Sequence, residues 1–275
     1  MKSSSMTRKC FCVLLCMAAL ASGSDAQARR RVVVLHTNDT HSHIDPLRTD
    51  GSLGVIERAA YVDSVIAADG KRNVLYLDAG DFDQGSSYFN VLNGDLEARL
   101  LRTMGLDAVA LGNHEFDNGI DELARRLRIY SGVTLCANYD FGGTPLEKLV
   151  KPCAVFRRGG YRIGVIGLLT DVSKVVAEPV AKQLNYLDPV EITEKYVSYL
   201  RDRKRCDIVL VLSHLGFDAD CHLARNSRGI TAIVGGHSHT DLSKPAVTAD
   251  LDGKPVTVVT AHCWGSVVGR LEIFD

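Results

Sequence analysis

Five short apolar runs, each followed at once by polar residues, stand out along the chain. They are residues 32–35, 74–77, 108–111, 208–212 and 230–234, and they are rich in valine, leucine and isoleucine. Short runs of this composition are typical of strands that are buried on both faces of a sheet. We therefore expect them to form the central strands of the fold.

Apolar stripes at helical spacing lie between these runs. They are Ile56, Ala59, Val62 and Ile66; then Ile120, Leu123, Ala124 and Leu127; and then Ile192, Tyr196 and Leu200. The third stripe follows Asp188 and Pro189, which suit the N-cap and the first position of a helix, with Glu191 as the capping-box residue. Strands that alternate with helices predict an α/β domain.

Two segments depart from simple alternation. Two strand-like runs flank Arg157-Arg158-Gly159-Gly160, which predicts a hairpin, and residues 255–274 are β-like without a helix. We therefore expect mixed sheets rather than one purely parallel sheet. No linker, low-complexity segment or repeat interrupts residues 29–275, so a single domain is expected there.

The amino terminus has the pattern of a secretory signal peptide. Lys2, Arg8 and Lys9 precede an apolar stretch at 10–21, and Ala26-Gln27-Ala28 offers a small-x-small cleavage site. The stretch is shorter than the roughly 20 residues that span a bilayer. We expect a signal peptide at 1–28 and an exported product, periplasmic or secreted, without stable membrane insertion. An uncleaved anchor is the alternative.

Composition narrows the class of protein. The chain has 275 residues, 46% hydrophobic and 24% charged, which excludes a disordered, collagen-like or coiled-coil chain. Its 32 basic and 33 acidic residues give a net charge of −1, so no global basic field would recruit a nucleic acid polymer. Beyond the predicted signal lie Cys136, Cys153, Cys206, Cys221 and Cys263. We expect them to be small buried side chains with one or two disulfides of undetermined pairing.

Residues that commonly bind metals follow the predicted strands. They are Asp39, His41, Asp81, Asn113, His214, His237 and His239. In open α/β sheets, ligands bind beyond the carboxyl ends of the strands. Each cluster alone has an ordinary explanation as a cap or a turn. Together the seven side chains outnumber the four ligands of one tetrahedral metal ion. They therefore predict two divalent cations about 4 Å apart that share a carboxylate.

Other histidines are expected to play supporting roles. His36, His43 and His262 are expected in the core or behind the metal ligands, and His222 at the surface.

The mixed imidazole, carboxylate and amide set of candidate ligands suits Zn, Mn, Fe or Co better than calcium.

The motifs together resemble those of the calcineurin-like metallophosphoesterases. They are Asn38-Asp39-x-His41, Gly80-Asp81-x-x-x-Gly85-Ser86, Gly112-Asn113-His114-Glu115-Phe116-Asp117, Ser213-His214-Leu215-Gly216 and Gly235-Gly236-His237-Ser238-His239. Within that family the chain is most similar to the 5'-nucleotidase group, which includes UDP-sugar hydrolases and 2',3'-cyclic phosphodiesterases. The resemblance covers residues 32–271.

The resemblance implies a four-layer α/β/β/α sandwich with two mixed β-sheets and a dinuclear site. One metal would take Asp39, His41, Asp81 and His239, and the other Asp81, Asn113, His214 and His237. The ions would be Zn, Mn, Co, Fe or Mg, and a metal-bound water or hydroxide would attack phosphorus in line. His114, oriented by Asp117, would be catalytic, and Asn113 and His114 would contact the substrate.

The resemblance also leaves alternatives open about substrate and partner. Full-length 5'-nucleotidases carry a carboxyl-terminal domain that binds the nucleobase, and this chain stops near where that domain would begin. We expect hydrolysis of phosphomonoesters, with 5'-nucleotides as the leading substrates and little base preference. The alternatives are a catalytic subunit that acts only with a separate carboxyl-terminal-type domain, a 2',3'-cyclic phosphodiesterase, a UDP-sugar hydrolase and a thiosulfohydrolase.

Overall fold

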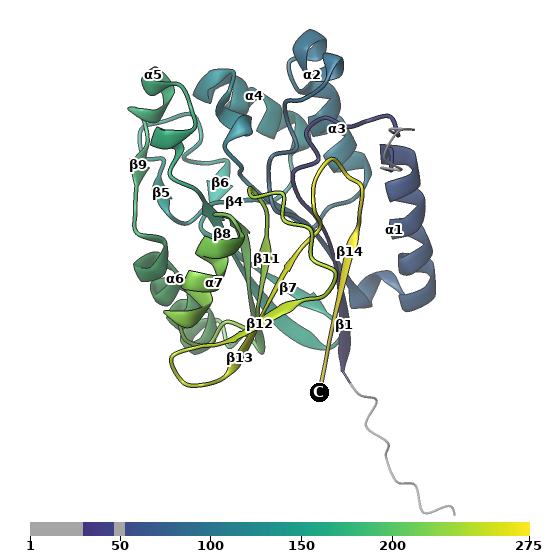
Figure 1. Cartoon of the computed structure of the whole chain (residues 1–275), viewed down its shortest axis with the longest axis vertical. Coiled ribbons are helices and arrows are strands. Elements are labelled where there is room, and N and C mark those ends of the chain that lie inside the picture. Colours follow the sequence, from purple (N-terminus) through teal and green to yellow (C-terminus); the bar gives the residue numbers. More distant parts are fainter. Residues whose placement is uncertain (1–29, 47–52) are drawn as a thin grey trace, which may run out of the picture.

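Two six-stranded β-sheets pack face to face, with helices on their outer sides (Figure 1). The computed structural model describes residues 30–46 and 53–275, and the predicted signal peptide lies outside these residues. The predicted four-layer α/β/β/α sandwich is confirmed.

The first sheet is built on the early part of the chain. Its order is β14 (Gly269–Phe274), β1 (Arg31–Thr37), β2 (Val74–Asp78), β3 (Ala108–Ala110), β4 (Thr134–Leu135) and β6 (Val150–Lys151). Neighbours from β1 to β6 are parallel, and β14 is antiparallel to β1.

The second sheet has both of its edge strands antiparallel. Its order is β12 (Ala246–Ala249), β13 (Pro255–Thr260), β11 (Ala232–Gly235), β10 (Ile208–His214), β8 (Tyr161–Leu169) and β7 (Cys153–Arg158). The hairpin β7–β8 and the β-rich carboxyl-terminal segment are as predicted, so both sheets are mixed. A small ribbon pairs β5 (Tyr139–Asp140) with β9 (Asn185–Tyr186).

Helices cover the outer face of each sheet. Those along the first sheet are α1 (Val55–Asp69), α3 (Asp95–Thr103) and α4 (Gly119–Tyr130), and those along the second are α6 (Pro189–Ser198) and α7 (Phe217–Arg225). Short helices α2 (Ser87–Leu92) and α5 (Glu178–Ala181) lie in loops, with single helical turns at Lys71–Asn73, His114–Phe116 and Val172–Lys174. A π-helical turn, Tyr199–Arg203, continues α6.

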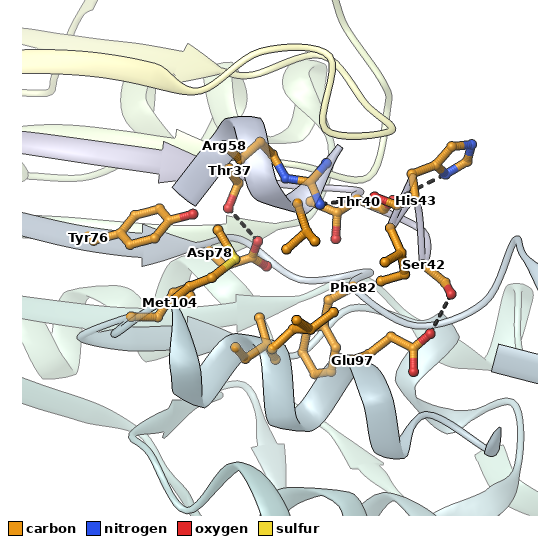
Figure 2. Close-up of a pocket in the computed structure, with 15 residues that line it drawn as sticks. Thr37, Thr40, Ser42, His43, Arg58, Tyr76, Asp78, Phe82, Glu97 and Met104 are labelled. Carbon is orange, nitrogen blue, oxygen red and sulfur yellow. Dashed lines mark hydrogen bonds between the residues drawn. The ribbon is translucent and has the colours of Figure 1, made fainter. Parts of the chain in front are cut away.

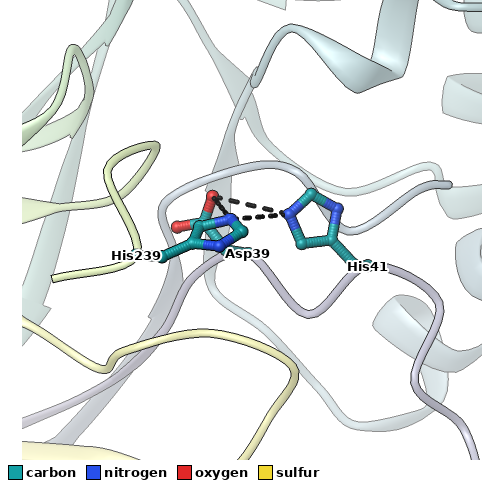
Figure 3. Close-up of side chains that lie close together, drawn as sticks. All are labelled: Asp39, His41 and His239. Carbon is teal, nitrogen blue, oxygen red and sulfur yellow. Dashed lines mark hydrogen bonds and ion pairs between the residues drawn. The ribbon is translucent and has the colours of Figure 1, made fainter. Parts of the chain in front are cut away.

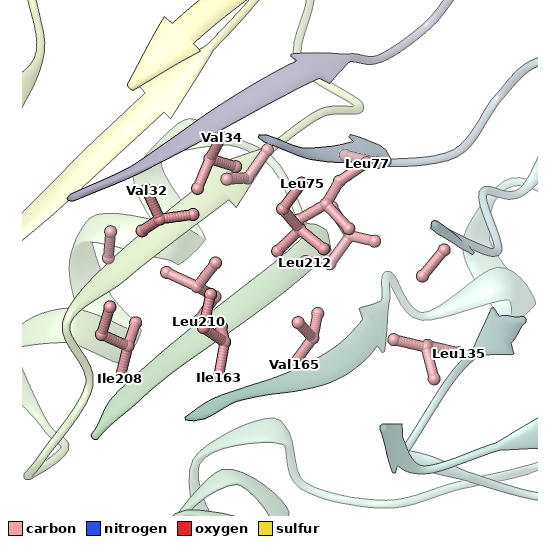
Figure 4. Close-up of a cluster of buried hydrophobic side chains, with 14 of the residues drawn as sticks. Val32, Val34, Leu75, Leu77, Leu135, Ile163, Val165, Ile208, Leu210 and Leu212 are labelled. Atoms are coloured by element: carbon pink, nitrogen blue, oxygen red, sulfur yellow. The ribbon is translucent and has the colours of Figure 1, made fainter. Parts of the chain in front are cut away.

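The core between the sheets explains why the strand sequences do not alternate between apolar and polar residues. Val32 and Val34 of β1 face Leu210 and other residues of the second sheet (Figure 4), whereas Val33 and Leu35 pack against the α1 side. Because each sheet is covered on both faces, successive residues are all buried. The apolar runs at 32–35, 74–77, 108–111 and 208–212 are therefore strands, as predicted.

The predicted stripe on the first helix is partly wrong. Ile56 is 78% exposed, and α1 instead buries Val55, Arg58, Val62 and Val65. The Arg58 guanidinium turns inward because it donates hydrogen bonds to the backbone oxygens of Leu53 and His43, at 2.8 and 3.0 Å. Because the buried face contains a charged residue, the apolar spacing in the sequence did not predict which face is buried. The other two stripes are confirmed, and Asp188 caps α6 by accepting from the amides of Val190 and Glu191.

The described cysteines include four free thiols, Cys136, Cys153, Cys206 and Cys221. Cys136 and Cys206 are buried, as expected of small apolar side chains, but no disulfide joins these four. Within residues 30–46 and 53–275, no helix is both long and apolar enough to cross a membrane.

We expect Leu210→Ala to lower the free energy of unfolding by about 2–5 kcal/mol, because it opens a cavity between the sheets. Leu210 is fully buried, whereas Leu251 is 51% exposed in a turn, so Leu251→Ala is the matched control and should change stability by about 0.5 kcal/mol or less. Urea denaturation measures both. Equal effects of the two substitutions would contradict the placement of the core.

Candidate metal centre

The carboxyl ends of five parallel strands deliver polar side chains to one edge of the sandwich. Asp39 and His41 follow β1, Asp81 follows β2, Asn113 and His114 follow β3, His214 ends β10, and His237 and His239 follow β11. Asp39, His41, Asp81, His237 and His239 have left-handed backbone, with φ between 46° and 74°. Such backbone costs free energy in residues other than glycine and is concentrated at functional sites.

The first group consists of Asp39, His41 and His239 (Figure 3). The Nε2 atoms of the two histidines lie 2.9 Å apart, and Asp39 Oδ1 lies 3.4 Å from His239 Nε2 and 3.9 Å from His41 Nε2. Two imidazole nitrogens and a buried carboxylate oxygen therefore point at a common position. This geometry suits a metal ion.

The second group consists of Asp81, His214 and His237. His214 Nε2 lies 3.0 Å from Asp81 Oδ2 and 3.9 Å from Asp39 Oδ1, while His214 Nδ1 donates to the backbone oxygen of Ala79 at 2.7 Å. Burial lowers the pKa of His214, but the carboxylates of Asp81 and Asp39 outweigh burial and raise it to about 10. This position therefore strongly favours a positive charge.

A third group, His41, Asp81 and His114, connects the other two. Asp81 belongs to the second and third groups and His41 to the first and third. The backbone amide of His114 donates to Asp81 Oδ1 at 2.8 Å, which fixes the orientation of that carboxylate. Asp81 therefore lies close to a histidine of each group, His41 of the first and His214 of the second.

His114 and Asp117 form a separate pair beside these groups. His114 Nδ1 lies 2.8 Å from Asp117 Oδ2, and both side chains are about one-third exposed. The hydrogen bond to Asp117 raises the pKa of His114, and partial burial opposes the rise. Asp117 therefore holds the His114 ring from its Nδ1 side.

The centre opens into a cleft of about 710 Å³. Its lining includes His41, His43, Asp81, Gln84, Gly85, Asn113, His114, Val175, His237, His239 and Trp264. This volume is typical of a small-molecule site. Sequence reasoning did not single out Gln84 or Val175, because neither belongs to a metal-type cluster.

A second cavity lies behind the cleft and is too small for a substrate (Figure 2). Its volume is about 30 Å³, and Asp78, Arg58, Tyr76 and Thr37 are among its lining residues. Thr37 Oγ1 donates to Asp78 Oδ2 at 2.6 Å, but burial dominates and raises the pKa of Asp78 to about 6. A cavity of this volume has room for one water molecule beside the polar groups of Thr37 and Asp78.

Glu115 holds the backbone around Asp81, a role that sequence reasoning missed. Its fully buried carboxylate accepts from the amides of Asp81 at 3.0 Å, Asp83 at 3.1 Å and Gly112 at 2.5 Å. Burial raises the pKa of Glu115 to about 7. Through these three hydrogen bonds, the Glu115 side chain connects the loop after β2 to the loop after β3. A β-carbon at Gly112 would overlap the Asp81 carboxylate, so the close approach requires glycine there.

Asn38 has a similar role for Asp39. Its Nδ2 donates to Asp39 Oδ2 and to the backbone oxygen of His262, both at 2.6 Å, and its Oδ1 accepts from the amide of Ala261 at 2.7 Å. Asn38 therefore orients the carboxylate and ties the loop after β13 to the centre. The adjacent position of Asn38 in the sequence was the only signal for this role.

The remaining histidines lie as expected. His43 Nδ1 lies 3.0 Å from the backbone oxygen of His41, and His262 Nδ1 lies 3.0 Å from that of His239, so both support candidate ligands from behind. His36 is buried in the core, and His222 is exposed on α7.

The residues present fit divalent cations. Asn113 Oδ1 is buried without a hydrogen-bond partner, and a buried polar atom of this kind needs one. The surrounding donors are imidazole nitrogens and carboxylate or amide oxygens, which suit Zn, Mn, Fe, Co or Mg.

Comparison with known proteins identifies the family. The sequence profile of the calcineurin-like phosphoesterases matches residues 32–241, and the chain belongs to that family. It is 33% identical to mouse 5'-nucleotidase over 96% of this chain and 50% of that protein. It is 31% identical to the 5'-nucleotidase of Diplobatis ommata over 95% of this chain and 48% of that protein.

Solved structures agree with this assignment. The 5'-nucleotidase precursor from Thermus thermophilus superposes with a TM-score of 0.82 and 38% identity, covering 88% of this chain and 51% of that one. The NAD nucleotidase of Haemophilus influenzae shares the fold, with a TM-score of 0.81 at 24% identity over 90% of this chain and 47% of that one. The chain spans about half the length of the curated relatives it matches.

We expect Asn38→Ala to weaken binding of Mn²⁺ or Zn²⁺ about 10- to 100-fold, because the Asp39 carboxylate loses the hydrogen bond that orients it. Isothermal titration calorimetry measures the change. Asn73→Ala is the matched control, since the Asn73 amide only donates to the backbone of Asp69. Unchanged affinity in Asn38→Ala would show that Asp39 needs no such support.

Proposed function

We propose that this chain hydrolyses phosphomonoesters, with 5'-nucleotides as the leading substrate class, at a centre of two divalent cations. The observation that carries the proposal is the convergence of two residue groups on one strand-end edge, with Asp81 between them. Seven donor side chains exceed the coordination sphere of one tetrahedral metal. The family assignment and the similarity to 5'-nucleotidases support the same reaction class.

The proposed ligand sets follow the two groups. One cation would be held by Asp39, His41, Asp81 and His239, and the other by Asp81, Asn113, His214 and His237, with Zn, Mn, Co, Fe or Mg as the ions. When bound, two divalent cations neutralise charge on the phosphate and lower the pKa of a coordinated water, which makes it a nucleophile at neutral pH.

The side chains beside the centre supply the remaining chemistry. Phosphoryl transfer needs positioning and charge stabilisation more than covalent help from the protein. We assign to Asn113 and His114 the contacts to the phosphoryl oxygens. The hydrogen bond of Nδ1 to Asp117 and the raised pKa of His114 favour a proton on Nε2, where it can stabilise developing charge and be given to the leaving oxygen.

Partner and location are part of the proposal. Because the chain spans about half of its relatives, we propose that a separate carboxyl-terminal-type domain can complete nucleotide recognition. We also propose export to the periplasm or the medium, directed by the signal peptide at 1–28. The proposed role of such a domain is tested by comparing phosphate release by the chain alone with release by the chain mixed with that domain.

A substrate panel tests the function itself. Adenosine monophosphate, p-nitrophenyl phosphate, a 2',3'-cyclic nucleotide and a UDP-sugar are compared with added Mn²⁺, Zn²⁺ or Co²⁺. We expect metal-dependent release of phosphate from the two monoesters. Turnover of only the cyclic nucleotide or only the UDP-sugar would overturn the proposed substrate class.

We expect Asp81→Ala to lose both cations, because one substitution damages both ligand sets, whereas Asp39→Ala should lose one. Both carboxylates are buried, so the pair is matched for burial and chemistry. Metal analysis after dialysis should give about two, one and no ions per chain for the wild type, Asp39→Ala and Asp81→Ala. Retention of both ions by Asp81→Ala would refute the bridging role.

We expect His114→Ala to keep its metals but to lose about 10²- to 10⁴-fold in kcat, the usual contribution of a positioned acid–base group. Asp117→Asn should lose less, because it only weakens the orientation and charge of His114. Steady-state kinetics paired with metal analysis separates the two roles. If metal content falls in His114→Ala, His114 is a ligand instead.

A further inference from the structure

Trp264 is the single tryptophan of the chain, and it lies at the rim of the cleft. Its side chain is 41% exposed and lines the same cleft as His114 and His239. Exposure alone would carry little weight, because scattered apolar residues are common on protein surfaces. Trp264 differs from such residues in how firmly its backbone and ring are held.

The backbone of Trp264 is tied directly to a candidate metal ligand. Its amide donates to the backbone oxygen of Asp39 at 2.6 Å. Asn38 binds the same loop at His262 and Ala261, and the left-handed backbone of Trp264, φ 58°, is a conformation that surrounding contacts must maintain. The position of the indole is therefore fixed relative to the centre.

The indole ring contacts two histidine rings, and part of its surface stays exposed to solvent. It stacks on His43 with ring centroids 5.8 Å apart and an interplanar angle of 28°, and it meets His239 edge-on at 6.3 Å. His239 also belongs to the first candidate metal group. One side chain therefore touches both the centre and the indole.

We propose that Trp264 is a specificity-determining residue, whose exposed indole surface stacks on the base of a nucleotide while the phosphate lies at the metal centre. This inference rests on the proposed function and deepens it. The contact between His239 and Trp264 places the indole beside the first candidate metal group, within the same cleft. Val175, 46% exposed in the same cleft, adds apolar surface.

Stacking predicts a particular kind of selectivity. Every base has an aromatic face, so a stacking platform tolerates different bases. The chain should therefore prefer nucleotides to sugar phosphates without a base, yet discriminate little among bases. The expectation of little base preference is therefore kept.

Fluorescence tests the contact without relying on turnover. Because Trp264 is the only tryptophan, all indole emission reports on this one side chain. We expect adenosine and adenosine monophosphate to quench it saturably and ribose 5-phosphate to leave it nearly unchanged. No quenching by adenosine, or an equal response to ribose 5-phosphate, would overturn the proposal.

Kinetics tests the consequence for specificity. Trp264→Ala should lower kcat/KM for adenosine monophosphate about 5- to 150-fold, equivalent to about 1–3 kcal/mol of stacking, and leave ribose 5-phosphate within about twofold. Trp264→Phe should restore most of the loss. Tyr61→Ala is the control, because Tyr61 is 37% exposed on α1 and does not line the cleft. It should change kcat/KM for neither substrate.

The outcomes separate this inference from the proposed function. An equal loss on both substrates in Trp264→Ala would mean that the indole acts only by holding His43 and His239, and the platform would be wrong. Saturable quenching without any phosphate release would refute the hydrolase and leave the platform standing. Equal turnover of both substrates without quenching would leave the hydrolase standing and refute the platform.

Discussion

The loops at the strand ends of this protein must hold two buried carboxylates, Asp39 and Asp81, close together at one edge of the sandwich. Each is at most 2% exposed, and His214 Nε2 lies 3.9 Å from one and 3.0 Å from the other. Buried charges without partners cost several kcal/mol each. The surrounding histidines, and the cations that we propose between them, offset that cost. The left-handed backbone at Asp39 and Asp81 is part of the same arrangement.

The sequence was sufficient for the features that are local along the chain. Candidate ligands lie within a few residues of the end of each apolar run, as at Asp39 or His214, so the order of residues alone places them near strand ends. It was not sufficient where a side chain bonds to a distant backbone. The inward turn of Arg58 and the three amides held by Glu115 exist only once the loops have come together. No spacing rule in one sequence shows them.

The supporting residues also connect the candidate metal centre to the rim of the cleft. Asn38 orients Asp39 and binds the loop that carries Trp264, whose amide in turn donates to Asp39. A change in that loop would therefore act on both the ligand and the aromatic rim. The Asp39 carboxylate and the loop that carries Trp264 are therefore parts of one connected network.

The central claim is that the strand-end residues bind two cations through a shared carboxylate. A crystal structure of the protein loaded with Mn²⁺ or Zn²⁺, with anomalous scattering to locate the ions, tests it most directly. We expect two anomalous peaks about 4 Å apart with the Asp81 carboxylate between them. A single peak, or two peaks that do not share Asp81, would contradict it.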